Sequence, residues 1–340
     1  MNNLPPLPLV NGVLEIDNSF MEKLIACPRS LEYDRLLKRR SAATSAPLTF
    51  GSAIHAALEY RYKVLGNTSP TIMDMQDIFD KVLQPFFDKN PQPEDDHRGL
   101  GFAFELMQQY VARYPAEPFQ LITNASGEVM SEMSFSTLLC ELSISRDLEA
   151  INETRNAAGE IVYTRITLNA GSTLQVYYTG RVDLPVIWDG QLIVIDHKTT
   201  SMLGSYYFDG QKVSPQFEGY AWAFERITSR KVTGFCINAI RTKEKPMKPR
   251  GSWDAWWDEG FARHKEYLRP GQLDEWRWNI IALLETFMFH YSRDYMPMQK
   301  KACTIYGKCP YFDVCYLPTS SRQQMLASDQ YTNNTWSPLK

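Results

Sequence analysis

The sequence predicts an α/β protein in which a central mixed β-sheet is flanked by helices. Apolar residues recur at helical spacing through the first third of the chain. The period changes towards alternation from about Glu128, and helical spacing returns over residues 272–292. Apolar residues make up 44% of the 340 residues, which is enough to bury a sizeable core and excludes wholesale disorder.

The N-terminal part is expected to be helical. A helix should start after Asn18-Ser19, which can cap it, and Pro28 predicts a break beside Cys27. Residues 41–49 are rich in Ser, Thr, Ala and Pro and are expected to form a linker. Further helices are expected over residues 70–115, interrupted by a polar loop at Asn90–Arg98.

Another helix is expected from Phe50-Gly51 to Tyr62. Its small residues would let it approach another element closely, and His55 lies on a stripe beside its apolar face. A single histidine in a helix is more often a packed or surface residue than a ligand. Neutral imidazole suits Mn²⁺ better than Mg²⁺, so His55 is nevertheless a candidate ligand.

The middle of the chain alternates as strands do, and Asp189-Gly190 predicts a tight hairpin turn. A helix at 214–226, a loop at 245–252 and the helix at 272–292 follow, and the chain after Leu317 is expected to be a loose, polar tail. The candidate strands are 128–137, 161–168, 173–183, 185–188, 191–196 and 233–240.

The most informative stretch is Leu192–Ile195 followed by Asp196-His197-Lys198. Four apolar residues in a row indicate a strand buried on both faces. Asp196 and Lys198 should point to the same side of that strand, and the hairpin should bring Asp183 beside Asp196. An Asp-x-Lys pattern alone arises by chance in many exposed strands. The combination with Asp183 favours a metal site.

These residue types suit the hydrolysis of a phosphodiester. Carboxylates hold hard cations such as Mg²⁺ or Mn²⁺, which stabilise charge on phosphate oxygens and help to produce a hydroxide near neutral pH. Lys198 could orient the attacking water or stabilise the developing charge. Gln216 and Tyr220 are four residues apart on a predicted helix and share one face. An ordinary amphipathic helix would explain them equally well.

Taken in order, these motifs resemble the PD-(D/E)XK nuclease superfamily, specifically its RecB-like branch, which includes CRISPR-adaptation and phage exonucleases. The resemblance reaches from about residue 18 to 316 and leaves residues 65–125 uncovered. Val182 stands where the family usually has proline. The matching segments are Ser19-Phe-Met-Glu-Lys-Leu-Ile-Ala-Cys27-Pro28, Phe50-Gly-Ser-Ala-Ile-His55, Gly180-Arg-Val-Asp183, Asp196-His-Lys198-Thr199 and Gln216-Phe-Glu-Gly-Tyr220.

The resemblance implies a restriction-endonuclease-like core and a role for each of these residues. Lys198 would be the catalytic lysine, acting with Asp183 and Asp196. Gln216 and Tyr220 would support substrate placement. The implied ligands of Mg²⁺ or Mn²⁺ are His55, Asp183, Asp196 and the backbone carbonyl of His197.

Cysteines form a second pattern. Three lie close together near the C-terminus, and Cys27 lies far upstream where the family has Cys-Pro. These cysteines could bind a metal, or they could be free thiols that are close only in sequence. The resemblance implies an iron–sulfur site of the [4Fe–4S] type, with zinc as the alternative. Cys140 and Cys236 have apolar strand contexts and are expected to be buried. The four implied ligands are Cys27, Cys303, Cys309 and Cys315.

The sequence offers several features for binding a nucleic acid, although its net charge is −3. Basic residues cluster at residues 29–40 and again at 241–250. Ordinary solvated surface would explain each cluster equally well. A group of tryptophans could either stack on the bases of a single strand or pack in the core, and the sequence favours neither. These tryptophans are Trp253, Trp256, Trp257, Trp276 and Trp278.

We expect a metal-dependent DNA exonuclease that acts on single strands or duplex ends in recombination, repair or phage replication. A non-catalytic DNA-end-binding or scaffold subunit is the alternative, and an enzyme cleaving RNA or nucleotides is a third reading. No helicase P-loop is present, so unwinding would need a helicase or recombination partner. No apolar run reaches the roughly 18 residues of a membrane span and no signal peptide is recognisable, so a cytoplasmic location without a membrane partner is expected.

One nuclease domain is expected over residues 1–340. Its parts are N-terminal helices at 18–64, a helical insertion at 65–125, a catalytic sheet core at 126–245, a C-terminal helix with the cysteines at 246–316, and a tail at 317–340. A metal cluster would join the N- and C-terminal segments.

Overall fold

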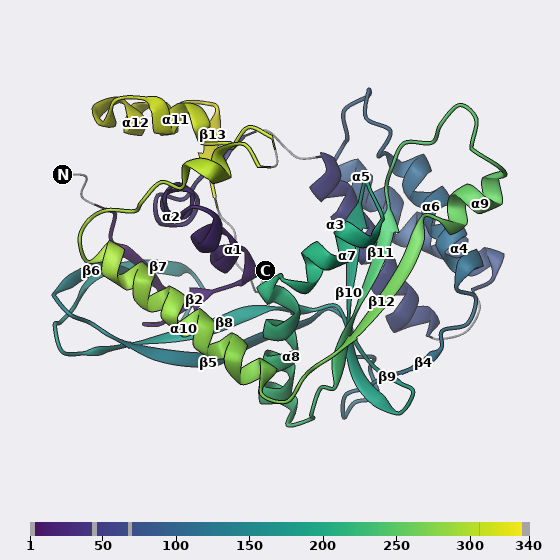
Figure 1. The fold of residues 1–340 in the computed structure, drawn as a ribbon, viewed down its shortest axis with the longest axis horizontal. Helices are drawn as coiled ribbons and strands as arrows, with labels where there is room; N and C mark the ends of the chain where they lie inside the picture. Colours follow the sequence, from purple (N-terminus) through teal and green to yellow (C-terminus); the bar gives the residue numbers. More distant parts are fainter. Residues whose placement is uncertain (1–3, 43–45, 67–69, 306, 335–340) are drawn as a thin grey trace. The chain divides into compact units, whose positions relative to one another are not determined.

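The computed structural model describes residues 4–42, 46–66, 70–305 and 307–334 (Figure 1). Contacts divide the chain into two compact units, each assembled from separate stretches of sequence. The terminal unit comprises Met1–Ala43, Phe135–Gly180 and Gly271–Lys340, and the central unit comprises Thr44–Ser134 and Arg181–Pro270. The expectation of one nuclease domain stays a prediction.

The central unit is built on a five-stranded sheet with the order β12-β11-β10-β9-β4. Strands β10 and β11 are parallel and the other neighbours are antiparallel, which confirms the predicted mixed sheet. The strands are β4 (Phe119–Leu121), β9 (Leu184–Trp188), β10 (Gln191–Thr200), β11 (Gly234–Arg241) and β12 (Phe261–Tyr267).

Helices cover both faces of this sheet. Alternate residues of β11 reach different cores: Cys236 packs with Phe50 of α3, whereas Ile237 packs with Phe217 of α8. Figure 1 shows α3 to α6 gathered beyond β10 and β11, with α7 and α8 on the other side. The helices are α3 (Ala46–Tyr60), α4 (Ile72–Ile78), α5 (Gln84–Lys89), α6 (Leu100–Arg113), α7 (Ser205–Lys212), α8 (Pro215–Thr228) and α9 (Trp253–Asp258), with π-helical turns η2 (Arg61–Leu65) and η3 (Phe79–Leu83).

The predicted hairpin joins β9 to β10. Asp189 and Gly190 have φ values of 52° and 73°, the left-handed pair that a type I′ turn requires. The pairing of Ile195 with Leu184 brings Asp183 level with Asp196. The hairpin therefore aligns the backbone positions of these two residues, as the sequence led us to expect.

Among the described residues, three smaller sheets lie wholly or mostly in the terminal unit. Their orders are β1-β6-β7, β2-β8-β5 and β13-β3. The strands are β1 (Leu7–Val10), β2 (Leu14–Ile16), β3 (Arg39–Ser41), β5 (Met133–Ser143), β6 (Leu148–Arg155), β7 (Ile161–Leu168), β8 (Thr173–Val182) and β13 (Tyr331–Asn333).

The long helix of the terminal unit, α10 (Gln272–Tyr291), lies against β8 and α1. Its Trp276 ring packs 5.5 Å from that of Tyr178, and its Phe287 ring packs 5.5 Å from that of Phe20. The helix agrees with the predicted span. The remaining helical elements are α1 (Asn18–Ala26), α2 (Pro28–Leu31), α11 (Phe312–Tyr316), α12 (Thr319–Leu326), the π-helical turn η1 (Glu32–Leu36) and the 3-10 turn η4 (Lys300–Cys303).

Several local predictions need correction. The N-cap of α1 is Asp17, whose Oδ1 accepts a 2.8 Å hydrogen bond from the Phe20 N–H, so neither Asn18 nor Ser19 caps the helix. The predicted break at Pro28 is confirmed, because α1 ends and α2 begins there. The expected linker at 41–49 is shorter, since α3 begins at Ala46; residues 43–45 lie outside the described residues.

The expected loose tail is also wrong for its described part. Residues Thr319–Leu326 form α12, and β13 pairs with β3. Leu326 and Tyr331 are buried, and these two apolar side chains hold the segment in place. Residues 128–132 of the candidate strand 128–137 lie outside β5, which begins at Met133. Within the described residues, no helix is both long and apolar enough to cross a membrane.

Candidate active site

His55 is carried by α3, which approaches β10 very closely. A Cβ added at Gly51 would lie 2.8 Å from Oγ1 of Thr199, closer than ordinary packing allows. The absence of a side chain at Gly51 therefore lets the helix lie directly on β10, as the small residues predicted. His55 lies one helical turn later, with its side chain 30% exposed.

His55 is one of three potential metal ligands that converge here. Its Nδ1 lies 3.5 Å from Oδ2 of Asp183 and 3.4 Å from Oε1 of Glu132. One ligand atom from each of these residues lies within 4.8 Å of the other two. Two carboxylates and one imidazole make a donor set that suits Mn²⁺ and, through the oxygens, Mg²⁺. The chemistry of the residues present therefore fits a divalent cation.

Glu132 is a site residue that the sequence analysis missed. Its φ is 50°, a left-handed backbone conformation that is uncommon for a residue with a long side chain. The Glu132 N–H donates a 2.8 Å hydrogen bond to the carbonyl of Asp183, and the Ser131 hydroxyl donates another of 3.1 Å to the same oxygen. These contacts hold the strained residue. Its only sequence signal was a carboxylate inside a candidate strand.

The electrostatics of this group reflect crowded carboxylates in a buried place. Burial, with the nearby charges of Asp196 and Glu132, raises the pKa of Asp183 to about 7 against the opposing effect of His55 and Lys198. Burial opposes protonation of His55, yet the neighbouring carboxylates outweigh it and raise its pKa to about 9. The Asp183 shift is mainly an effect of burial, whereas the His55 shift comes from the neighbouring carboxylates. A bound cation would favour the ionised form of these carboxylates.

The opposite side of the β10 strand end carries the second group of predicted residues. Lys198 Nζ lies 2.7 Å from Oδ2 of Asp196, and it donates a 2.8 Å hydrogen bond to Oε1 of Gln216. Gln216 Nε2 donates to Oδ1 of Asp196 at 3.2 Å and to the Tyr220 hydroxyl at 2.9 Å. The structure thus joins Asp196, Lys198, Gln216 and Tyr220 in one network between β10 and α8.

His197 connects the two groups. Its backbone N–H donates a 2.7 Å hydrogen bond to Oδ2 of Asp183, while its neighbours Asp196 and Lys198 contact Gln216 of α8. Burial, followed by the charges of His55, Arg263 and Lys198, holds the pKa of the His197 ring well below its usual value. Asp196 is outside the set of ligand atoms that lie within 4.8 Å of one another, although its charge acts on both His55 and Asp183.

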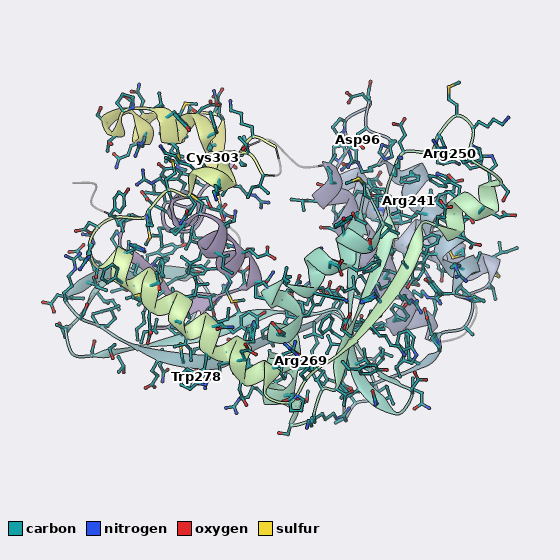
Figure 2. The ribbon with its side chains drawn as sticks, in the orientation of Figure 1. Asp96, Arg241, Arg250, Arg269, Trp278 and Cys303 are labelled. Atoms are coloured by element: carbon teal, nitrogen blue, oxygen red, sulfur yellow. The ribbon has the colours of Figure 1, made fainter. Side chains whose placement is uncertain are left out.

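The four predicted cysteine ligands all lie in the terminal unit. Cys27 and Cys303 meet at the backbone of Gln299, whose N–H lies 3.4 Å from Sγ of Cys27 and whose carbonyl lies 3.9 Å from Sγ of Cys303. The Cys309 N–H donates a 2.9 Å hydrogen bond to the Cys303 carbonyl. Burial raises the pKa of the Cys315 thiol to about 11, and the nearby Cys27 and Cys309 thiols contribute. Figure 2 shows Cys303 close to the C-terminal helices.

The other two cysteines behave as predicted. Cys140 is 7% exposed, and Cys236 is fully buried in the core of the central unit. Burial raises the pKa of both thiols.

Two residues of the first basic cluster are engaged in structure, while Lys38 and Arg40 are exposed. Arg29 is buried and donates two hydrogen bonds to the carbonyl of Met296, while Arg35 forms ion pairs with Asp17 and Asp34. The second cluster is more open. Lys243, Lys248 and Arg250 are exposed or partly exposed in the segment after β11, whose ends are marked by Arg241 and Arg250 in Figure 2.

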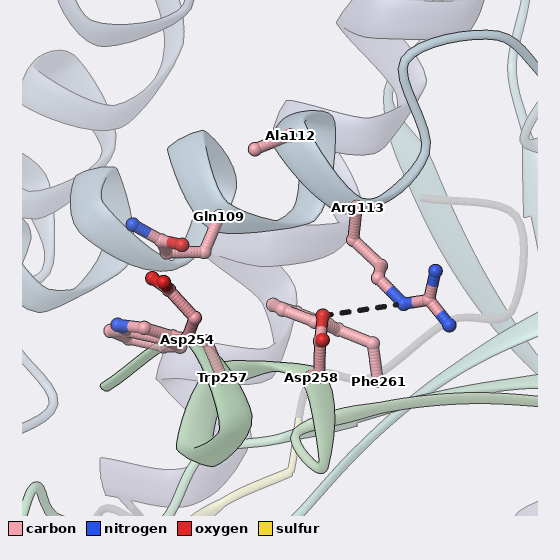
Figure 3. A pocket seen from close by; sticks show the side chains of 7 residues that line it. All are labelled: Gln109, Ala112, Arg113, Asp254, Trp257, Asp258 and Phe261. Atoms are coloured by element: carbon pink, nitrogen blue, oxygen red, sulfur yellow. Dashed lines mark ion pairs between the residues drawn. The ribbon is translucent and has the colours of Figure 1, made fainter. Parts of the chain in front are cut away.

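Some of the tryptophans are core residues and others are exposed. Trp256, Trp257 and Trp276 are at most 8% exposed, so they are core residues. Trp253 and Trp278 are 40% and 63% exposed and remain available for stacking. A separate depression lies between α6 and α9 and contains none of the candidate site residues (Figure 3). Arg113 and Asp258 form a 3.6 Å ion pair on its wall.

A family model covers most of the sequence. Residues 19–316 match the model of the PD-(D/E)XK nuclease superfamily, and the chain belongs to that superfamily. A solved structure from Eubacterium rectale, provisionally named an exonuclease, is 11% identical, with 90% of this chain and 89% of that chain covered and a TM-score of 0.45. The structure of SSO0001 is 12% identical over 75% of this chain and 80% of its own, with a TM-score of 0.23. None of the curated proteins matches the sequence.

Proposed function

We propose that this chain is a Mg²⁺- or Mn²⁺-dependent deoxyribonuclease that hydrolyses phosphodiester bonds. One observation carries the proposal: the end of β10 joins a potential metal-binding group to a lysine network. On one side lie His55, Glu132 and Asp183, and on the other Lys198 is held 2.7 Å from Asp196. A scaffold protein has no need to hold a lysine beside buried carboxylates at the end of a strand.

Each residue then has a definite task. His55, Asp183 and Glu132, with Asp196 and the carbonyl of His197, would hold the cation. When bound, that cation would withdraw charge from the phosphate and make a water acidic enough to attack it. Lys198 would place its ammonium where negative charge develops. Asp196 and Gln216 fix the direction of that ammonium group.

Gln216 and Tyr220 would support the placement of the substrate. The Tyr220 hydroxyl accepts a hydrogen bond from Gln216, so a contact of either side chain with a DNA phosphate would also act on Lys198. Exposed basic residues after β11 and the half-exposed Trp253 supply phosphate contacts and a stacking surface in the same unit.

The substrate we favour is single-stranded DNA or a duplex end, cleaved by an exonuclease of the RecB-like branch in recombination, repair or phage replication. The order of the motifs supports that branch. The chain has no P-loop in its sequence, so a helicase or recombination protein would supply any unwinding.

We also propose that Cys27, Cys303, Cys309 and Cys315 hold a [4Fe–4S] cluster. A tetrahedral zinc with Zn–S bonds of about 2.3 Å draws its sulfurs to roughly 3.8 Å from one another. Among the described residues, no three cysteine sulfurs lie within 4.8 Å of one another. A cubane cluster, in which each thiolate binds a different iron, does not require its four sulfurs to lie so close together.

The decisive experiment uses end-labelled single-stranded and double-stranded DNA with Mg²⁺, Mn²⁺ or EDTA. Release of mononucleotides or short products with either metal, and none with EDTA, is expected. Internal cuts in a circular single strand would exclude a strict exonuclease. Tight binding of DNA ends without cleavage under any metal would favour the scaffold alternative instead.

A further inference from the structure

A polar row crosses the sheet of the central unit beside the catalytic strand. Asn238 lies in the middle of the apolar strand β11 and is 1% exposed. The sheet register pairs it with His197 of β10 on one side and with Arg263 of β12 on the other. Side chains of directly paired residues point to the same face, so these three form one row. The row faces the core that includes Tyr62 and Tyr110.

The hydrogen bonds along this row have a defined direction. Arg263 Nε donates to Oδ1 of Asn238 at 3.2 Å, and a guanidinium has no acceptor, so this identifies the amide oxygen. The amide nitrogen of Asn238 then faces Nδ1 of His197 at 2.8 Å. Because that nitrogen only donates, Nδ1 of His197 must accept and its ring proton must sit on Nε2.

A buried ionic cluster fixes the far end of the row. Both carboxylate oxygens of Glu117 bind the guanidinium of Arg263, at 2.5 and 3.0 Å, and the Glu117 side chain is completely buried. Arg61 lies 3.3 Å from the same carboxylate, and the Tyr62 hydroxyl donates to it at 2.9 Å. Arg263 therefore cannot turn away from Asn238 without breaking a buried ion pair.

The same cluster holds the ring of His197 from a second direction. The Tyr62 ring stacks on it with 5.9 Å between centroids and an interplanar angle of 5°. His197 stands between Asp196 and Lys198 in the chain, and its N–H binds Asp183. The packed His197 ring therefore belongs to the same residue whose backbone N–H binds Asp183, so ring and backbone are anchored together.

We propose that Asn238 is a positioning residue: it fixes the His197 ring as the Nε2–H tautomer and so holds the backbone of β10 for Asp183, Asp196 and Lys198. The part that concerns metal binding rests on the proposed function. The tautomer does not, because it follows from hydrogen bonds alone. Loss of a partner behind a metal site typically weakens metal affinity about 10- to 100-fold.

The first test is spectroscopic and needs neither DNA nor metal. The chain has five histidines, so ¹⁵N-histidine labelling with two-bond ¹H–¹⁵N correlations resolves each ring, and His197→Phe assigns the His197 signals. At pH 8 we expect a proton on Nε2 and none on Nδ1 of His197. In Asn238→Asp, which keeps the shape but removes the donor, the proton should move to Nδ1. A wild-type Nδ1–H tautomer, or an unchanged tautomer in this variant, would overturn the proposal.

The second test measures Mn²⁺ binding from the paramagnetic resonance signal of the free ion. Asn238→Ala and Asn238→Asp should raise the dissociation constant at least about 10-fold. The matched control is Cys236→Ala, two residues away on the same face of β11, which should change it less than about twofold while losing comparable core packing. Equal effects in control and variants, or no effect in folded Asn238 variants, would refute the positioning role. A wild-type protein that binds no Mn²⁺ would contradict the proposed function, and the tautomer alone would then decide the role of Asn238.

Discussion

The backbone N–H of His197 donates a 2.7 Å hydrogen bond to Oδ2 of Asp183, and the same carboxylate oxygen lies 3.5 Å from Nδ1 of His55. A single carboxylate thus connects β10 to the helix that covers it. The proposed metal site depends on the alignment of a hairpin, a strand backbone and α3. Each of these contacts suggests a variant that should alter one property of the site.

Lys198→Ala should lower the single-turnover rate of DNA cleavage by about 100-fold or more, because removal of one preorganised group at a developing charge has an effect of that size. Folding should be little changed, since the Lys198 side chain is 23% exposed. Lys265→Ala is the matched control: that lysine also pairs with a carboxylate, Asp189, in the same sheet. Cleavage by Lys198→Ala near the wild-type rate would remove the lysine from the mechanism.

Glu132→Asn should separate stability from metal binding. Asn tolerates the left-handed backbone at this position better than Glu does, and the substitution removes one of three neighbouring carboxylates. We therefore expect a thermal midpoint equal to or above that of the wild type, with weaker Mn²⁺ binding by calorimetry. A lower midpoint together with unchanged Mn²⁺ affinity would show that Glu132 is only structural.

Gly51→Ala should displace α3 from β10, because the new Cβ would meet Oγ1 of Thr199 at 2.8 Å. Since His55 is carried by that helix, its alignment with Asp183 should suffer, and the metal concentration needed for half-maximal cleavage should rise. Thr199→Ala removes the obstructing atom, so the double variant should recover most of the loss. Ser52→Ala, on the exposed side of the same helix, should have no effect. Equal defects in the single and double variants would argue against this contact.

Sequence alone could predict the parts of the site that are close in the chain. Asp183, Asp196 and Lys198 are separated by one short hairpin, whose turn residues and apolar strand are legible without a structure. The pair Gln216 and Tyr220 follows from helical spacing. Gly51 among small residues predicted the close approach of α3, although its partner Thr199 could not be inferred.

The site residues that the sequence did not reveal depend on strand register and backbone conformation. Glu132 joins the site only because its N–H reaches the Asp183 carbonyl, a contact that no local pattern encodes. Asn238 looked like one polar residue in an apolar strand, and its meaning appears when β10 and β12 are aligned beside it. Strand β12 was missed because its residues are largely polar and only partly buried, as in an edge strand.

Glu32 should make stability depend on pH. Burial raises its pKa from 4.5 to about 7, against the opposing charges of Arg29 and Arg322. The folded chain therefore keeps this proton to a higher pH than the unfolded chain. The resulting stability is fully present below about pH 4.5 and is lost as the pH rises through 7. Glu32→Gln should resemble the wild type at pH 4.5.

At pH 8, Glu32→Gln should be more stable than the wild type, by up to about 3 kcal/mol of unfolding free energy. Denaturant unfolding at both pH values measures the difference. The exposed Glu22→Gln should show no such dependence on pH. A Glu32→Gln variant that loses stability at pH 8 would mean that the ionised carboxylate is needed by its arginine neighbours.

The last prediction is that Cys27, Cys303, Cys309 and Cys315 act as one unit. Cys27 and Cys303 enclose most of the chain, and both bond to the backbone of Gln299. A link across so long a loop removes much unfolded-state entropy, and metal binding then contributes directly to folding. Anaerobically purified protein should be brown and contain about four irons per chain.

Replacement of any one of these four cysteines by serine should remove colour and lower the thermal midpoint together. Cys140→Ser and Cys236→Ser are the matched controls: both change a buried thiol, so stability can fall, but iron and colour should remain. Oxidation should bleach the protein and lower its midpoint before DNA cleavage chemistry is lost, because the soft thiolate site is chemically distinct from the oxygen-rich hydrolytic site. Stoichiometric zinc without iron or sulfide would refute the cluster and keep the four-cysteine link. Serine variants that keep full iron content would refute the link itself.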